Sequence, residues 1–148
     1  MILKVPYFKQ DTDYTCGPTS LQMVLDFFGK FKSEAKLAKE VHCRKETGSS
    51  HIHIIEAVRR EGFRCREKHE ASIEDLKESL KEHLPAIVNY TEPVDNADHY
   101  AVVIGFSHSN IILNDPADGQ NFRISEKEFF ERWHSAHCRR WMLVVYPR

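Results

Sequence analysis

The chain has 148 residues, of which 41% are hydrophobic and 29% are charged, and this size and composition predict one globular domain spanning residues 1–148. Lys and Arg together number 21 and Asp and Glu 22, a net charge of −1 that gives no reason to expect a nucleic-acid partner or an anionic membrane surface. Apolar runs are far shorter than the roughly 20 residues that span a bilayer, and no cationic and apolar leader opens the chain, so we expect no membrane insertion and a cytoplasmic location.

Helices are predicted in the first half of the chain. Residues 16–28 carry apolar side chains on more than one helical face, with Pro18 in the first turn and Gly29 after the end, a pattern typical of a buried helix. Three further helices are predicted at residues 33–42, at residues 50–61 and from Ser72 onward, where Asp75 stands in capping-box spacing.

Strands are predicted in the second half, which is rich in Val, Ile and aromatic residues separated by turn residues. One helix interrupts them, at residues 125–134, where Ser125 and Glu128 have capping-box spacing. Helices followed by a mainly antiparallel sheet indicate an α+β fold, with the long buried helix packed against one face of the sheet. The predicted strands are residues 86–90, 99–106, 111–114 and 140–146.

Four cysteines could pair as two disulfides, but a chain of this size without an export signal is expected to keep them as free thiols. The nine histidines raise the question of a metal site. No Cys-x-x-Cys pair with a matching second half occurs, so we expect no bound metal and interpret His51 and His53 as surface polar residues.

Cys16 is the first residue of the predicted buried helix, and its position favours reactive sulfur chemistry. Unpaired N–H groups and the positive end of the helix dipole stabilise a thiolate there. Gly17 lets a substrate backbone approach the sulfur, and Pro18 loses no hydrogen bond in the first turn. The alternative is that Cys16 is one more small buried apolar residue, and a base close to the sulfur would favour the reactive thiol over this alternative.

His99 begins the predicted strand 99–106 and is the best candidate for that base. If residues 107–109 form a three-residue hairpin loop, Asp115 on the next strand lies opposite Ala101 and shares the face of His99. A carboxylate there is within reach of an imidazole N–H, whereas a loop of another length without a bulge would turn it away. Asp115 also fits an ordinary turn before Pro116, which does not exclude an orienting role.

Attack by a thiolate on an acyl carbon places negative charge on oxygen, which requires N–H donors aimed at that oxygen. The main-chain N–H of Cys16 is one candidate donor, and the side-chain amide of Gln10 is the other.

Three motifs follow one another along the chain: Gln10 ahead of Tyr14-Thr15-Cys16-Gly17-Pro18-Thr19, then His99-Tyr100-Ala101-Val102-Val103-Ile104-Gly105, then Asn114-Asp115-Pro116. In order and spacing they resemble the bacteriocin-processing, double-glycine leader peptidase family of papain-like cysteine proteases. The resemblance implies a papain-like fold and no metal or organic cofactor. It further implies Cys16 as nucleophile, His99 as general base and then acid, Asp115 as the residue that orients His99, and Gln10 in the oxyanion hole.

Many members of that family are fused to a membrane-spanning, ATP-driven exporter, whereas this chain carries neither the spans nor a phosphate-binding loop. We therefore expect a peptidase domain that works alone on a peptide or protein substrate, with a separate transporter as a candidate partner. Cleavage after a Gly-Gly leader is one expected activity. A non-catalytic peptide-binding domain and an acyltransferase or deamidase on the same fold are the alternatives.

Overall fold

A computed structural model of the protein describes residues 1–136 and 138–148, and within them five helices and one six-stranded sheet form an α+β fold. This confirms the predicted fold class. The helices are α1 (Cys16–Phe27), α2 (Glu34–Glu40), α3 (His51–Arg60), α4 (Ile73–Lys81) and α5 (Glu126–Arg132). The strands are β1 (Phe63–Lys68), β2 (Ala86–Thr91), β3 (Asp98–Ser107), β4 (Asn110–Asp115), β5 (Gly119–Ser125) and β6 (Met142–Pro147).

Serine caps set where four of the five helices begin. Ser33, Ser50, Ser72 and Ser125 each accept a hydrogen bond from the main-chain N–H three residues further on, which satisfies a donor left free in the first turn. At Ser72 the predicted capping box with Asp75 is complete. These caps explain why the predicted helix positions agree with the structure to within one or two residues.

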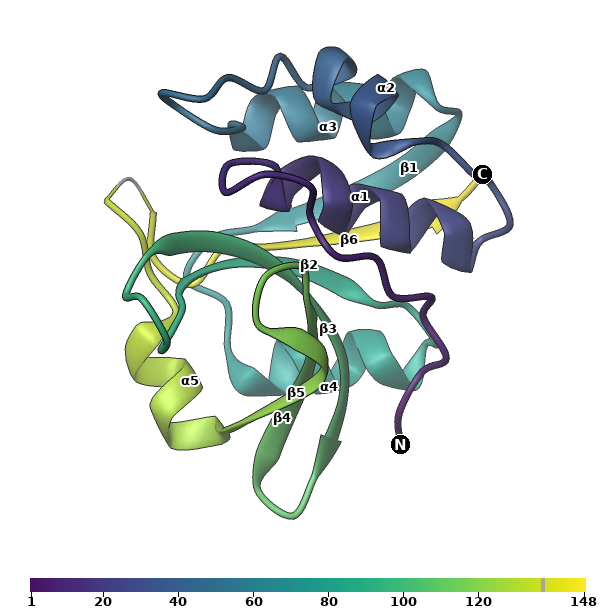
Figure 1. The fold of residues 1–148 in the computed structure, drawn as a ribbon. Helices are drawn as coiled ribbons and strands as arrows, with labels where there is room; N and C mark the ends of the chain where they lie inside the picture. Colours follow the sequence, from purple (N-terminus) through teal and green to yellow (C-terminus); the bar gives the residue numbers. More distant parts are fainter. Residues whose placement is uncertain (137) are drawn as a thin grey trace.

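The sheet has the order β1-β6-β2-β3-β4-β5, and every neighbouring pair is antiparallel. Two of its strands, β1 and β5, were not predicted from the sequence. In Figure 1, helices α2 and α3 lie above β6, helix α1 passes in front of β1 and β6, and helices α4 and α5 lie below these strands. Helix α1 is the buried one, because all of its residues from Gly17 to Leu25 are buried, and it packs against β3 and α2.

The hairpin between β3 and β4 differs from the prediction in its loop. The loop is His108 and Ser109 alone, with φ of 51° and 66° as a type I′ turn requires, instead of the three residues 107–109. A β-bulge at Ile104 then shifts the register of the pair by one residue. The N-terminal segment runs beside this bulge, where the N–H of Leu3 donates to the carbonyl of Ile104 at 2.8 Å.

Candidate active site

Cys16 is the first residue of α1 and is half-buried at the helix start. The preceding residue, Thr15, caps the helix without a side-chain hydrogen bond, so its side chain satisfies none of the first-turn N–H groups. The sulfur accepts a hydrogen bond from the main-chain N–H of Tyr100 at 3.5 Å. Helix α1 therefore brings Cys16 to the start of β3, where His99 lies.

His99 and Asp115 form a buried pair on neighbouring strands. The Nε2 atom of His99 lies 2.6 Å from Oδ1 of Asp115, and the two side chains are 6% and 0% exposed. This contact leaves Nδ1 as the nitrogen available to Cys16. The structure therefore brings together three of the four candidate residues from distant parts of the sequence.

The bulge in β3 fixes the face on which Asp115 lies. Val102 pairs with Asn114 beyond the bulge, so the next pair places Asp115 opposite Ala101. Asp115 therefore occupies the predicted position diagonal to His99, although the loop is one residue shorter than predicted.

The surroundings favour the charged forms of both members of this pair. Burial would lower the pKa of His99, but hydrogen bonds and charge from Asp115 and Cys16 outweigh it and raise the pKa well above 6.5. Burial would likewise raise the pKa of Asp115, yet the hydrogen bond and charge of His99 and the hydrogen bond from Tyr90 hold it below 3.8. An imidazolium between a carboxylate and a thiol is the arrangement that activates a cysteine nucleophile.

Tyr90 is a site residue that the sequence reasoning missed. It lies on β2, where its Cα pairs with that of His99 in the antiparallel register, and its phenol donates to Oδ2 of Asp115 at 2.5 Å. The ring is fully buried and packs against Phe129 of α5. Its position opposite His99 could have identified Tyr90, since cross-strand partners are close neighbours. The sequence did not predict which residues of these two strands pair with each other.

Gln10 lies close to this site through its main chain. Its N–H donates to the carbonyl of Pro116 at 3.0 Å, directly after Asp115, while its side-chain Nε2 donates to the carbonyl of Thr12 at 2.7 Å. Its Oε1 is buried and has no hydrogen-bond partner among the described residues. The structure thus brings Gln10 to the turn after Asp115, and its contact with a substrate oxygen stays a prediction.

Glu34 holds the Gln10 segment against the start of α1. Its carboxylate accepts hydrogen bonds from the N–H of Asp11 at 2.9 Å and from the hydroxyl of Thr19 at 2.8 Å. Because Thr19 is one turn beyond Cys16 and Asp11 follows Gln10, this buried carboxylate fixes the two segments relative to each other.

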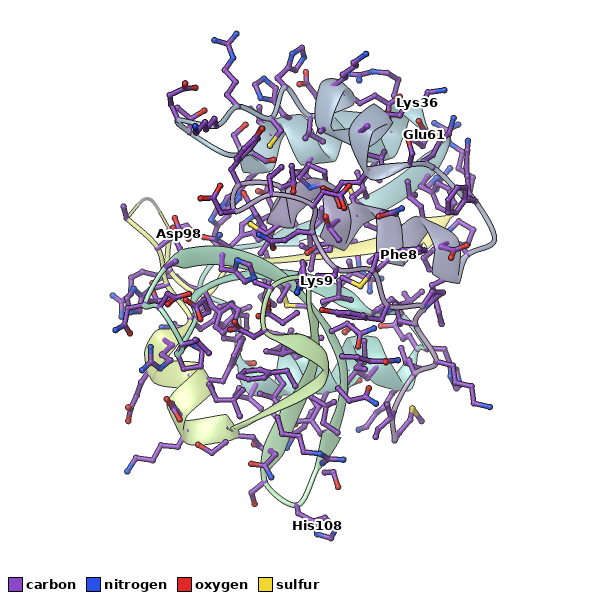
Figure 2. All side chains as sticks on the ribbon, in the orientation of Figure 1. Phe8, Lys9, Lys36, Glu61, Asp98 and His108 are labelled. Atoms are coloured by element: carbon purple, nitrogen blue, oxygen red, sulfur yellow. The ribbon has the colours of Figure 1, made fainter. Side chains whose placement is uncertain are left out.

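A cavity of about 630 Å³ opens beside Cys16. Residues from the helical layer and from the sheet line it together, among them His51 of α3, Asp98 at the start of β3 and Tyr100. Figure 2 shows Asp98 where the sheet meets the helical layer, whereas His108 lies at the far tip of the β3–β4 hairpin. His51 lines this cavity, and its ring stacks on that of Trp141 with centroids 3.9 Å apart. It is therefore not the exposed polar residue that the sequence suggested.

All four cysteines are free thiols, as predicted, and burial raises the pKa of three of them, Cys43, Cys65 and Cys138. Within the described part of the chain, no three His, Cys, Asp or Glu side chains are grouped so that they could hold a metal ion. None of the helices in residues 1–136 and 138–148 is both long enough and apolar enough to cross a bilayer.

Comparison with known proteins agrees with this architecture. The model of the Peptidase_C39 like family matches residues 2–140. An uncharacterized protein of Methanothermobacter marburgensis is 35% identical over 112 residues, which cover 76% of this chain and 72% of that protein.

Solved structures show the same fold. The peptidase domain of Streptococcus ComA, a bi-functional ABC transporter, superposes with a TM-score of 0.80 at 25% identity, covering 95% of this chain and 97% of that one. A double glycine motif protease from an AMS/PCAT transporter, crystallised with the leader peptide, gives 0.79 at 24% identity and covers 99% and 94% of the two chains. A C39-like peptidase from Bacillus anthracis gives 0.80 at 19%, with 99% and 98% covered.

Proposed function

Because this chain belongs to the Peptidase_C39-like family of cysteine peptidases, we propose that it hydrolyses peptide bonds with Cys16 as nucleophile, His99 as proton carrier and Asp115 as the residue that orients His99. One observation carries the proposal. A buried His99–Asp115 pair, joined at 2.6 Å, lies beside a half-buried cysteine at a helix start. Because a buried ion pair adds little net stability compared with apolar residues, its combination with a thiol that borders a cavity favours a functional role.

The first half of the reaction forms an acyl-enzyme. The Cys16 thiolate attacks the carbonyl carbon of the scissile bond, and the carbonyl π electrons move to oxygen. As the oxyanion collapses, the C–N bond breaks and the imidazolium of His99 gives its Nδ1 proton to the leaving amine. Asp115 keeps its bond to Nε2 throughout, so the ring stays oriented while its charge changes.

The second half releases the acyl group. Neutral His99 takes a proton from water at Nδ1, the hydroxide attacks the thioester carbonyl, and the C–S bond breaks to give a carboxylic acid and the starting ion pair. The oxyanion of each half-reaction lies near the start of α1, where the N–H of Cys16 can donate to it. We assign the second donor to Gln10, whose main chain is bonded to the turn after Asp115 and whose segment is tied to α1 by Glu34.

We propose a peptide with a double-glycine leader as the first substrate to test, because the protease of similar fold described above was crystallised with such a peptide. We propose a transporter of such peptides as the candidate partner, because the similar peptidase domains described above belong to transporters. Four free thiols fit a reducing compartment, and we propose the cytoplasm as the place of action.

Digestion of a defined peptide library, read by mass spectrometry, tests this function. Shortened products that appear with the wild-type chain and disappear with Cys16→Ala are the expected result. Cys65→Ala is the matched control, because it removes another half-buried thiol, on β1, and should cleave like wild type. Intact peptides that carry one-dalton shifts or amine conjugates would instead show a deamidase or transferase, and retained but unchanged peptides would show a binding domain.

A further inference from the structure

The geometry points to Tyr90 as a positioning residue that holds Asp115 ionised and turned toward His99, so that the reactive state of Cys16 depends on a buried phenol two side chains away. This inference rests on the proposed function for its purpose. Its chemistry concerns the Cys16, His99 and Asp115 side chains themselves and can be measured without a peptide substrate.

The two oxygens of the Asp115 carboxylate have very different surroundings. Oδ1 accepts three hydrogen bonds, from Nε2 of His99 at 2.6 Å and from the main-chain N–H groups of Ala117 at 3.0 Å and Asp118 at 2.9 Å. Oδ2 accepts one, from the phenol of Tyr90 at 2.5 Å, and no other donor to it occurs among the described residues. Because Asp115 is 0% exposed, bulk water cannot replace a phenol that is removed.

Tyr90 has no freedom to leave this position. Its ring is 0% exposed and packs between the rings of His99 and Phe129, at centroid distances of 6.2 and 5.5 Å. Burial, followed by the negative charge of Asp115, raises the pKa of the phenol, so Tyr90 keeps its proton and always acts as the donor. Tyr90, His99 and Asp115 come from β2, β3 and β4, three neighbouring strands, which makes the chain of hydrogen bonds part of the sheet itself.

The physical consequence concerns the charge on the carboxylate. A hydrogen bond donated to an ionised group stabilises that group more than one donated to a neutral group, and the low dielectric of a buried site strengthens it further. Without the phenol, Asp115 takes up a proton at a higher pH. Once neutral, it no longer supports the imidazolium of His99, and the Cys16 thiolate loses its counter-ion in turn.

The test is the rate of Cys16 alkylation by iodoacetamide between pH 4 and pH 9, read by peptide mass spectrometry, in wild type and in Tyr90→Phe. We expect the acid edge of the Tyr90→Phe profile, the pH at which the rate falls to half, to lie about one pH unit higher, so that alkylation is about tenfold slower at a pH below the edge. Burial and a hydrogen bond to Glu92 raise the pKa of the neighbouring Asp118 to about 7, and because both carboxyl groups are present in wild type and variant, their titration should affect the two profiles alike. Tyr7→Phe is the matched control. It removes a phenol that donates at 2.8 Å to the main-chain carbonyl of Asp115 and leaves the carboxylate untouched, so its edge should stay in place.

A double-variant cycle separates this role from a packing effect. In an Asp115→Asn background there is no carboxylate to keep ionised, so adding Tyr90→Phe should move the acid edge no further. An unmoved edge in the single variant, or an equal shift when Tyr90→Phe is added to Asp115→Asn, would overturn the inference.

A further measurement on the wild-type protein does not depend on the folding of any variant. The Tyr90 phenol proton should give a slowly exchanging downfield NMR signal, identified in the wild-type protein by its nuclear Overhauser effects to the Tyr90 ring protons, and a rapidly exchanging proton would contradict the buried bond to Asp115. If these alkylation and NMR results are obtained while no peptide is cleaved, the inference stands and the proposed hydrolase function fails.

Discussion

Replacing His99 with Ala should slow alkylation of Cys16 far more at pH 6 than at pH 9. An ordinary cysteine with a pKa of about 8.5 is only about 0.3% thiolate at pH 6, whereas a thiolate paired with an imidazolium is largely ionised there. The ionised fraction alone would give a ratio of about 300 between wild type and variant. A thiolate of low basicity is also a weaker nucleophile, and a Brønsted coefficient of about 0.4–0.5 lowers this ratio by more than one order of magnitude, so we expect a measured ratio of about 10.

The other three thiols provide an internal reference for this measurement. Burial raises the pKa of Cys43, Cys65 and Cys138, so these residues should label slowly at pH 6 in both proteins. Time-resolved mass spectrometry of the alkylated peptides reports all four positions in one sample. Equal labelling of the four cysteines at pH 6, or a His99→Ala protein that labels Cys16 as fast as wild type, would refute an activated thiol at this site.

The remaining predictions concern stability. The raised pKa of His99 stabilises the fold fully below about pH 6.5, and this stabilisation is lost as the pH rises through the pKa of His99 in the folded protein. The lowered pKa of Asp115 stabilises the fold fully above about pH 3.8, and this stabilisation is lost as the pH falls through the pKa of Asp115 in the folded protein. The free energy of unfolding measured in urea should therefore be highest between these two pH values, and its pH dependence should flatten in His99→Ala. Ser72→Ala removes the side-chain cap of α4 and should cost about 1 kcal/mol in thermal unfolding while the alkylation rate of the candidate nucleophile stays unchanged. Gly17→Ala places a Cβ 2.8 Å from Oγ and 2.9 Å from Cβ of Ser49, so it should cost about 1–3 kcal/mol, and a second change, Ser49→Gly, should recover most of the loss.

The two strands that the sequence did not reveal are the two edges of the sheet. β1 reads Phe-Arg-Cys-Arg-Glu-Lys and β5 reads Gly-Gln-Asn-Phe-Arg-Ile-Ser, and both are largely exposed. Charged and polar residues are what an edge strand needs in order to avoid pairing with other chains, but they remove the apolar signal by which strands are found. The four predicted strands are the buried ones, because their Val, Ile and aromatic residues are the core itself.

Local signals were sufficient to place Cys16 at the start of a helix and insufficient to find Tyr90. The position of Cys16 at a helix start follows from the residues around it, because Pro18 and the apolar residues that follow determine where α1 begins. Tyr90 carries no such local signal. Its role exists only because the β2–β3 register places it opposite His99 and the β3–β4 register brings Asp115 to the same place, and no short stretch of sequence contains both pairings.

The contact between His99 and Asp115 was predicted correctly although the predicted loop between their strands was one residue too long. A two-residue turn without a bulge would place Asp115 on the opposite face from His99, since a shift of one residue reverses every side chain of a strand. The bulge at Ile104 adds the missing residue, and its carbonyl, inside the irregular stretch, accepts the N–H of Leu3. The N-terminal segment that leads to Cys16 thus also forms a hydrogen bond to the bulge, and this bulge places Asp115 on the same face of the sheet as His99. The register of the β3–β4 hairpin is therefore coupled to the path of the first residues, which is a long-range dependence that turn propensities at residues 107–109 could not contain.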